Sequence, residues 1–363
     1  MIRLFQFLGL GFVLLMALAA VSWLIDDTGD QRQMREALPA IPGRDAVTLG
    51  GSTGNGIRYP LMCIDGADYY WNAQDFFEVA AVADLILERP SPPRYWLVVA
   101  APTAQSYDNG APASERGARR REIYRLLFRN GRFGMIGGDW RQWLVTIFTP
   151  ALGYDAWGGR FHRVLHEVGL ADAPSPPIDW AARDRITVDP NLAASDAEAF
   201  TQRQAEHLER VDYYDPTVAR RSEQALARLN QRIRAHGGTM ILVIPPMTEA
   251  VRTSTERRMG RRVREFDGVV ARLAADGVVV SDHWRDPAFA RRYDLFVDNQ
   301  HLNGAGAEAF SRLLAVELRS RGVLPPSTCN VAQAAETSAS PQPPDMRRWP
   351  VFAEVLHRGE LNE

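Results

Sequence analysis

A short apolar segment runs directly into a glycine-rich turn at residues 46–54, AVTLGGSTG. The apolar part has the length and composition of a buried strand, and the glycines allow a tight change of direction behind it. Further apolar segments of strand length, bounded by turn residues, lie at residues 68–71, 94–101, 240–244 and 278–281. The sequence therefore predicts five short strands.

Segments with helical periodicity separate these strands, for example residues 74–88 and 215–236. Asp215 and Pro216 are typical of a helix start, and Gly237 follows the expected helix end. Alternating strands and helices predict an α/β fold with a parallel sheet. In such folds ligands bind at the carboxyl ends of the strands, where Ser52 is expected.

A second informative segment is VDNQHLNG, residues 297–304, in which Asp298 stands three residues before His301. A serine hydroxyl is a weak nucleophile, so a neighbouring imidazole must accept its proton, and a carboxylate must orient that imidazole. One tight turn can place Asp298 and His301 on the same side. We expect Ser52, His301 and Asp298 to act as nucleophile, base and orienting acid.

Each segment alone has a simpler interpretation. A Gly-Gly-Ser-Thr-Gly run is often a plain turn, because Ser and Thr bond their own backbone. Asp298 could equally cap a helix over residues 305–318. The two signals occur at opposite ends of one α/β pattern, and that combination favours the catalytic interpretation.

The spacing Gly50-x-Ser52-x-Gly54 also matches the nucleophile elbow of α/β-hydrolases, but there the serine follows several strands. The arrangement instead resembles the SGNH (GDSL-like) hydrolase superfamily, with an early Gly-Asp-Ser block and a late Asp-x-x-His block. Residues 298–301 match the late block, and residues 302–318 resemble its usual continuation. The resemblance implies a flavodoxin-like three-layer sandwich and an acyl-serine intermediate.

This sequence departs from the family pattern at two places. Gly51 replaces the Asp of the early block, as in membrane-anchored branches that resemble alginate O-acetyltransferases and the D-alanyl-lipoteichoic-acid family. The Gly-x-Asn-Asp block, which normally supplies an oxyanion-hole asparagine, is absent after residues 95–101. The backbone amide of Ser52 is therefore the first expected oxyanion donor, with Asn72 and Gln74 as weaker candidates.

The resemblance implies a serine esterase or O-acyltransferase that acts on an acyl ester of an envelope or secreted glycan. A glycan or small acyl ester is the expected substrate, and a membrane-bound acyl carrier protein is a further partner implied by the anchored relatives. No cofactor is expected. The alternative is a non-catalytic glycan-binding or polysaccharide-assembly protein with a degenerate SGNH fold.

The N-terminal segment, residues 4–25, is apolar and long enough to cross a bilayer as one helix. Arg3 precedes it and Asp26 follows it, which places the remaining chain outside the cytoplasm. A cleavable signal peptide is the rival interpretation, because residues 17–19 resemble a cleavage site. We expect a single-pass inner-membrane protein with a periplasmic or otherwise extracytoplasmic catalytic domain.

The expected organisation is an anchor at 4–25, a linker at 26–44, an SGNH-like domain at 45–324, a disordered linker at 325–345 and a tail at 346–363. Within the domain, residues 102–214 form an insertion rich in aromatic residues. It is expected to be a lid over a glycan cleft, a membrane-surface segment or a small second core. The net charge of −2 shows no excess of positive charge, so the sequence does not predict nucleic-acid binding.

Three smaller features complete the expectations. Cys63 and Cys329 could pair in an exported protein, although Cys63 is equally well explained as a small buried residue. His162 and His166 are four residues apart but lack the Glu of a metalloprotease motif, so no metal site is expected. Arginines cluster at 119–121 and 257–264, and solvated helix faces are favoured there over contacts with anionic lipid or polysaccharide.

Overall fold

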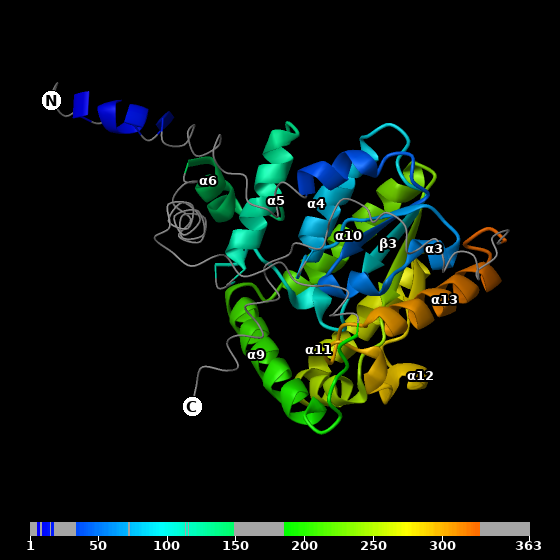
Figure 1. Ribbon diagram of the computed structural model, residues 1–363. Helices are drawn as coiled ribbons and strands as arrows, with labels where there is room; N and C mark the ends of the chain where they lie inside the picture. Colours follow the sequence, from blue (N-terminus) through cyan, green and yellow to red (C-terminus); the bar gives the residue numbers. More distant parts are fainter. Residues whose placement is uncertain are drawn as a thin grey trace, which may run out of the picture.

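The computed structural model describes residues 34–148, except 72, 113 and 115, and residues 185–326, together with 6, 7, 9–14, 16 and 17 (Figure 1). Several predictions fall outside these residues. They are the pair His162 and His166, part of the aromatic insertion, and the predicted linker and tail after residue 326. The predicted domain limits therefore stay predictions.

Five parallel strands form a single sheet in the order β2-β1-β3-β4-β5. They are β1 (Ala46–Gly50), β2 (Gly66–Asp68), β3 (Tyr95–Val99), β4 (Thr239–Ile244) and β5 (Val279–Asp282). The predicted α/β class and parallel sheet are confirmed. β2 was predicted at 68–71 and begins earlier, although Tyr69 and Trp71 still donate backbone hydrogen bonds to β1.

Helices cover both faces of the sheet (Figure 1). One face packs against α4 (Phe76–Leu87), α5 (Gly117–Arg129), α10 (Val218–Ala235) and α11 (Glu249–Ala275), and the other against α3 (Tyr59–Met62) and α13 (Gly304–Ser320). Successive side chains of β3 alternate between the two cores, with Trp96 in the first and Leu97 in the second. Each fully buried aliphatic side chain stabilises the fold by about 1.5–3 kcal/mol.

The remaining elements connect these layers. The described part of the predicted insertion contains η3 (Ala104–Ser106), α5, α6 (Trp140–Phe148) and α9 (Ala193–Tyr214). The others are η1 (Leu38–Ala40), η2 (Ser52–Gly56), α12 (Pro287–Ala290) and η4 (Tyr293–Leu295). The helix predicted from residue 215 begins at Val218, because Asp215 accepts the amide hydrogen of Thr217 in a turn before the helix.

Ion pairs join the long helices α9 and α11. Arg257 and Arg258 of α11 both contact Glu198 of α9, and Arg262 lies 2.7 Å from Asp212. Arg262 is almost fully buried, so the prediction of a purely solvated arginine face is wrong there. These arginines instead hold two helices together.

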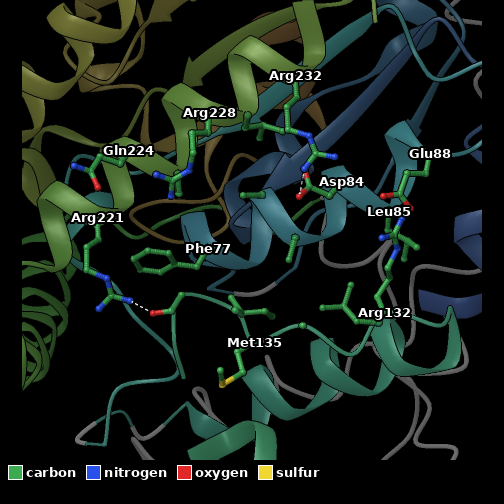
Figure 2. A pocket seen from close by; sticks show the side chains of 18 residues that line it. Phe77, Asp84, Leu85, Glu88, Arg132, Met135, Arg221, Gln224, Arg228 and Arg232 are labelled. Carbon is green, nitrogen blue, oxygen red and sulfur yellow. Dashed lines mark hydrogen bonds and ion pairs between the residues drawn. The ribbon is translucent and has the colours of Figure 1, made fainter. Parts of the chain in front are cut away.

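A groove with a volume of about 720 Å³ lies between α4, α10 and the loop at residues 132–137. Figure 2 shows Arg221, Arg228 and Arg232 along its α10 side, with Phe77 and Asp84 from α4 nearby. An ion pair between Arg232 and Asp84 crosses the groove. Its lining includes none of the predicted catalytic residues.

The described residues between 6 and 17 are helical, and their large apolar side chains are exposed. Across the parts of the chain that the structure describes, we find no helix both long and apolar enough to span a membrane. Much of the predicted anchor at 4–25 lies outside those parts. The anchor therefore stays a prediction.

Cys63 ends α3 in a left-handed conformation (φ 51°) and is disulfide-bonded. Cys329 is the only other cysteine in the sequence and lies outside the described residues, so the pairing of Cys63 with Cys329 stays a prediction.

Reducing this disulfide is expected to lower the free energy of unfolding by about 2–4 kcal/mol, because the open chain gains conformational freedom when unfolded. Urea denaturation with and without dithiothreitol measures the change. Cys63→Ser should match the reduced wild type and should not respond to reductant. Equal midpoints for the oxidised wild type and Cys63→Ser would contradict the prediction.

Candidate active site

Ser52 is the first residue of η2, and only Gly51 separates it from the end of β1. Gly50 has φ +113°, and a Cβ atom there would lie 2.1 Å from the carbonyl oxygen of Val99 in β3. The turn therefore requires glycine, both for its conformation and for its close approach to β3. β1 lies between β2 and β3, so Ser52 stands where the strand order reverses, the usual ligand position in such sheets.

His301 lies on a short loop between η4 and α13 that is fixed by its own backbone. The Val297 amide donates to the His301 carbonyl at 2.8 Å, and Phe296 and Leu302 form an antiparallel bridge. Asn303 caps α13 by accepting the Gly306 amide hydrogen at 3.0 Å. These hydrogen bonds therefore hold the His301 backbone in a fixed position.

The structure brings Ser52, His301 and Asp298 together. Ser52 Oγ lies 2.8 Å from His301 Nε2, across 249 residues of sequence. His301 Nδ1 lies 2.7 Å from Asp298 Oδ2 and 2.9 Å from Oδ1. The predicted juxtaposition is confirmed, and the catalytic roles stay a prediction.

Asp298 is held as a carboxylate that faces the imidazole. Its Oδ1 accepts the amide hydrogens of Gln300 and His301, each at 2.8 Å. Burial alone would raise the pKa of Asp298, but the charge of His301 and these hydrogen bonds lower the pKa to about 2. The helix-cap alternative does not hold, because Asn303 caps α13.

These contacts define the tautomer of His301. An ionised carboxylate can only accept hydrogen bonds, so Nδ1 carries the hydrogen donated to Asp298. Nε2 then carries the lone pair that can accept the hydroxyl hydrogen of Ser52. The Ser52 side chain is only half-buried. The arrangement can therefore activate a serine that a substrate can reach.

A second serine, histidine and acid lie together around β5 but lack this arrangement. Ser281 Oγ is 3.0 Å from His283 Nε2, and Asp286 is 3.2 Å from Nδ1. Ser281 is fully buried, however, and its hydroxyl donates to Glu317 at 2.5 Å. Glu317 also lies 2.9 Å from His283 Nε2, so this imidazole faces carboxylates on both sides. This second cluster links β5 to α13 and is closed to substrate.

Two of the three expected oxyanion donors, the Ser52 amide and Gln74, lie within the described residues. The backbone amide of Ser52 has no hydrogen-bond acceptor among the residues that the structure places. Asn72 lies outside them. Gln74 is buried, its Oε1 accepts the Gly50 amide hydrogen at 2.8 Å, and its Nε2 contacts no acceptor within the described chain. A donor role for each of them stays a prediction.

The loop after β3 contains an asparagine that the sequence patterns did not identify. Asn109 Nδ2 donates to the carbonyl of Ala73 at 2.9 Å, and its backbone amide donates to Asp75 at 2.6 Å. Ala73 has φ +57°, which is uncommon for a residue with a side chain. Asn109 thereby fixes the loop that precedes α4.

Arg120 is fully buried, so the prediction that residues 119–121 form a solvated face is wrong for it. Its guanidinium lies 2.7 Å from Asp75, 3.1 Å from Glu78, 3.0 Å from Asp108 and 3.6 Å from Asp139. Burial raises the pKa of Glu78 to about 8 and that of Asp139 to about 6, against the attraction of Arg120. We call Arg120 and these four acids the Arg120 cluster.

Known families and curated proteins provide no relative: no family model matches the chain, and neither does any curated protein. Within the described residues, no group of three or more His, Cys, Asp or Glu side chains is arranged to hold a metal ion. The contact of Ser52, His301 and Asp298 is therefore the feature that bears on function.

Proposed function

We propose that this protein is an SGNH-like serine esterase or O-acyltransferase. The observation that carries the proposal is the continuous contact from Ser52 Oγ through the His301 imidazole to the Asp298 carboxylate. This order of groups is what an acyl-serine mechanism requires. The half-buried serine and the lowered pKa of Asp298 further support it.

The proposed reaction begins with attack of Ser52 Oγ on the carbonyl carbon of an acyl ester, while the hydroxyl proton moves to His301 Nε2. The ester bond to the leaving alcohol then breaks, and His301 returns the proton to that alcohol. A water or a sugar hydroxyl attacks the acyl-serine in the same way, with His301 as base, and Ser52 regains its proton. Asp298 stabilises the imidazolium in both halves.

The oxyanion that forms in each step needs preorganised donors. The Ser52 amide is the first of these, because it lies beside the nucleophile and has no acceptor among the described residues. The Nε2 group of Gln74 has no acceptor within the described residues but is buried, so it is a weaker choice as a donor.

The strand order also supports the finer fold assignment. The order β2-β1-β3-β4-β5, with helices on both faces, is that of flavodoxin-like sandwiches. The nucleophile follows the first strand and the acid and base precede the last helix, as the SGNH resemblance implies.

A location outside the cytoplasm is part of the proposal. The disulfide of Cys63 supports it, since such bonds persist mainly in oxidising compartments. The exposed apolar side chains between residues 6 and 17 support attachment to a membrane. An envelope or secreted glycan, with a membrane-bound acyl carrier as donor, is the proposed setting.

Labelling with a fluorophosphonate tests the proposal, because this probe reacts with an activated serine and does not depend on the natural substrate. Wild type is expected to be labelled and Ser52→Ala is not. Ser281→Ala is the matched control and should be labelled like wild type, because Ser281 is closed to solvent. Equal labelling of folded wild type and Ser52→Ala would support the non-catalytic glycan-binding alternative instead.

A further inference from the structure

The backbone of Gly50 is held from both sides by the loop that follows β2. Its amide donates to Gln74 Oε1 at 2.8 Å, and its carbonyl accepts the Trp71 amide hydrogen at 2.9 Å. Gly50 adopts φ +113°, and it stands two residues before Ser52. A rotation of this peptide would therefore change the direction in which the Ser52 side chain points.

The orientation of the Gln74 side chain follows from its partner. A backbone amide can only donate, so the side-chain oxygen must face Gly50. Gln74 is only 7% exposed, and the Gly50 amide would lose a buried acceptor if this side chain were removed. A buried amide left without an acceptor is costly enough to favour another conformation of the turn.

The residues on either side of Gln74 are anchored as well. The Ala73 carbonyl accepts from Asn109 Nδ2 at 2.9 Å, and Asp75 accepts from the Asn109 amide at 2.6 Å and from Arg120 at 2.7 Å. Asp75 also caps α4 through the Glu78 amide at 2.9 Å. Gln74 therefore has little freedom to follow a moving turn.

We propose that Gln74 is a positioning residue that fixes the nucleophile turn through the Gly50 amide, so that Ser52 Oγ stays within reach of His301 Nε2. The Arg120 cluster and Asn109 brace the loop that carries Gln74. The segment after β3, which carries Asn109 and Arg120, therefore helps to position Ser52 and does not only lie over the site. This inference rests on the proposed function.

The test compares Gln74→Met with Gln74→Glu. Methionine has a similar length and no strong acceptor, whereas glutamate keeps a carboxyl oxygen that can face Gly50. Gln74→Met is expected to lower the second-order rate of fluorophosphonate labelling by about 10²-fold, the size of effect that a misplaced reacting group produces. Gln74→Glu should recover the rate to within about tenfold of wild type.

Gln105→Met is the matched control. Gln105 is also a buried glutamine, but it donates to the Arg262 carbonyl and has no hydrogen bond to the nucleophile turn. It should label at the wild-type rate. The NMR signal of the proton between His301 Nδ1 and Asp298 should persist in Gln74→Met, because that pair lies on a separate loop.

Each outcome decides the inference. Wild-type labelling of Gln74→Met, failure of Gln74→Glu to recover the rate, or loss of the His301 proton in Gln74→Met would overturn it. The first result shows no positioning role, the second points to the Nε2 group, and the third shows general disruption. Absence of Ser52-dependent labelling in wild type would instead refute the proposed function, so the two failures are distinguishable.

Discussion

His301→Gln is expected to lower kcat/KM for an activated acyl ester by about 10⁴- to 10⁶-fold. The imidazole nitrogen 2.8 Å from Ser52 Oγ is the group placed to take the hydroxyl proton, and a glutamine amide cannot replace it as a base. Glutamine can still donate a hydrogen bond toward Asp298, so the loop should keep its conformation. Steady-state hydrolysis measured on folded protein gives the ratio.

A double substitution checks that His301 and Asp298 act as one unit. Asp298→Asn alone should cost about 10⁴-fold, because an amide can hold the wrong tautomer of the imidazole. His301→Gln combined with Asp298→Asn should be no slower than His301→Gln, since the acid acts only through the base. Multiplicative losses would contradict this dependence and would give Asp298 a separate role.

Buried strands were predictable because both faces of a parallel sheet are covered by helices. Every residue of β3 is buried, and the sequence there is continuously apolar. β2 was misplaced because the edge strand reads Gly-Ala-Asp, with no apolar pattern, whereas the aromatic residues after it are buried without being part of the strand.

The proximity of Ser52 and His301 was predictable because the chemistry expected of them restricts both residue type and position. Parallel strands bring all their carboxyl ends to one edge, so the early serine and the late histidine could be expected to meet there. The distance of 2.8 Å between them agrees with that expectation. The family resemblance supplied the order of the two blocks along the chain.

The supporting residues could not be predicted in the same way. Asp75 and Glu78 have the spacing of a capping box, which is a local pattern. Arg120 and Asn109 reach them from a later segment, and no local feature of the sequence determines how that segment packs. Three consecutive arginines are usually solvated, and here only the tertiary fold places Arg120 among four acids.

Arg120→Met is expected to lower the free energy of unfolding by about 3–5 kcal/mol at pH 8, because it leaves buried carboxylates without their cation. Arg120 is fully buried and lies between 2.7 and 3.6 Å from Asp75, Glu78, Asp108 and Asp139. Urea denaturation of the variant and wild type measures the difference.

The loss should depend on pH with a definite sign. Burial raises the pKa of Glu78 to about 8 and that of Asp139 to about 6 in the folded protein, above the ordinary range of carboxyl groups. The folded state therefore binds these protons more tightly than the unfolded state, and their contribution to stability falls as the pH rises toward 8. Without Arg120 the free energy of unfolding should fall more steeply as the pH rises. Arg120→Met should therefore lose less stability relative to wild type at pH 5 than at pH 8.

Arg272→Met provides the control for a general effect of losing an arginine. Arg272 pairs with Glu223 at 2.5 Å, but its side chain is 59% exposed, so solvent screens the pair. Its replacement should change the free energy of unfolding by about 1 kcal/mol or less. A similar loss in both variants, or a loss in Arg120→Met that does not grow between pH 5 and pH 8, would show that the Arg120 cluster does not hold the fold through its buried charges.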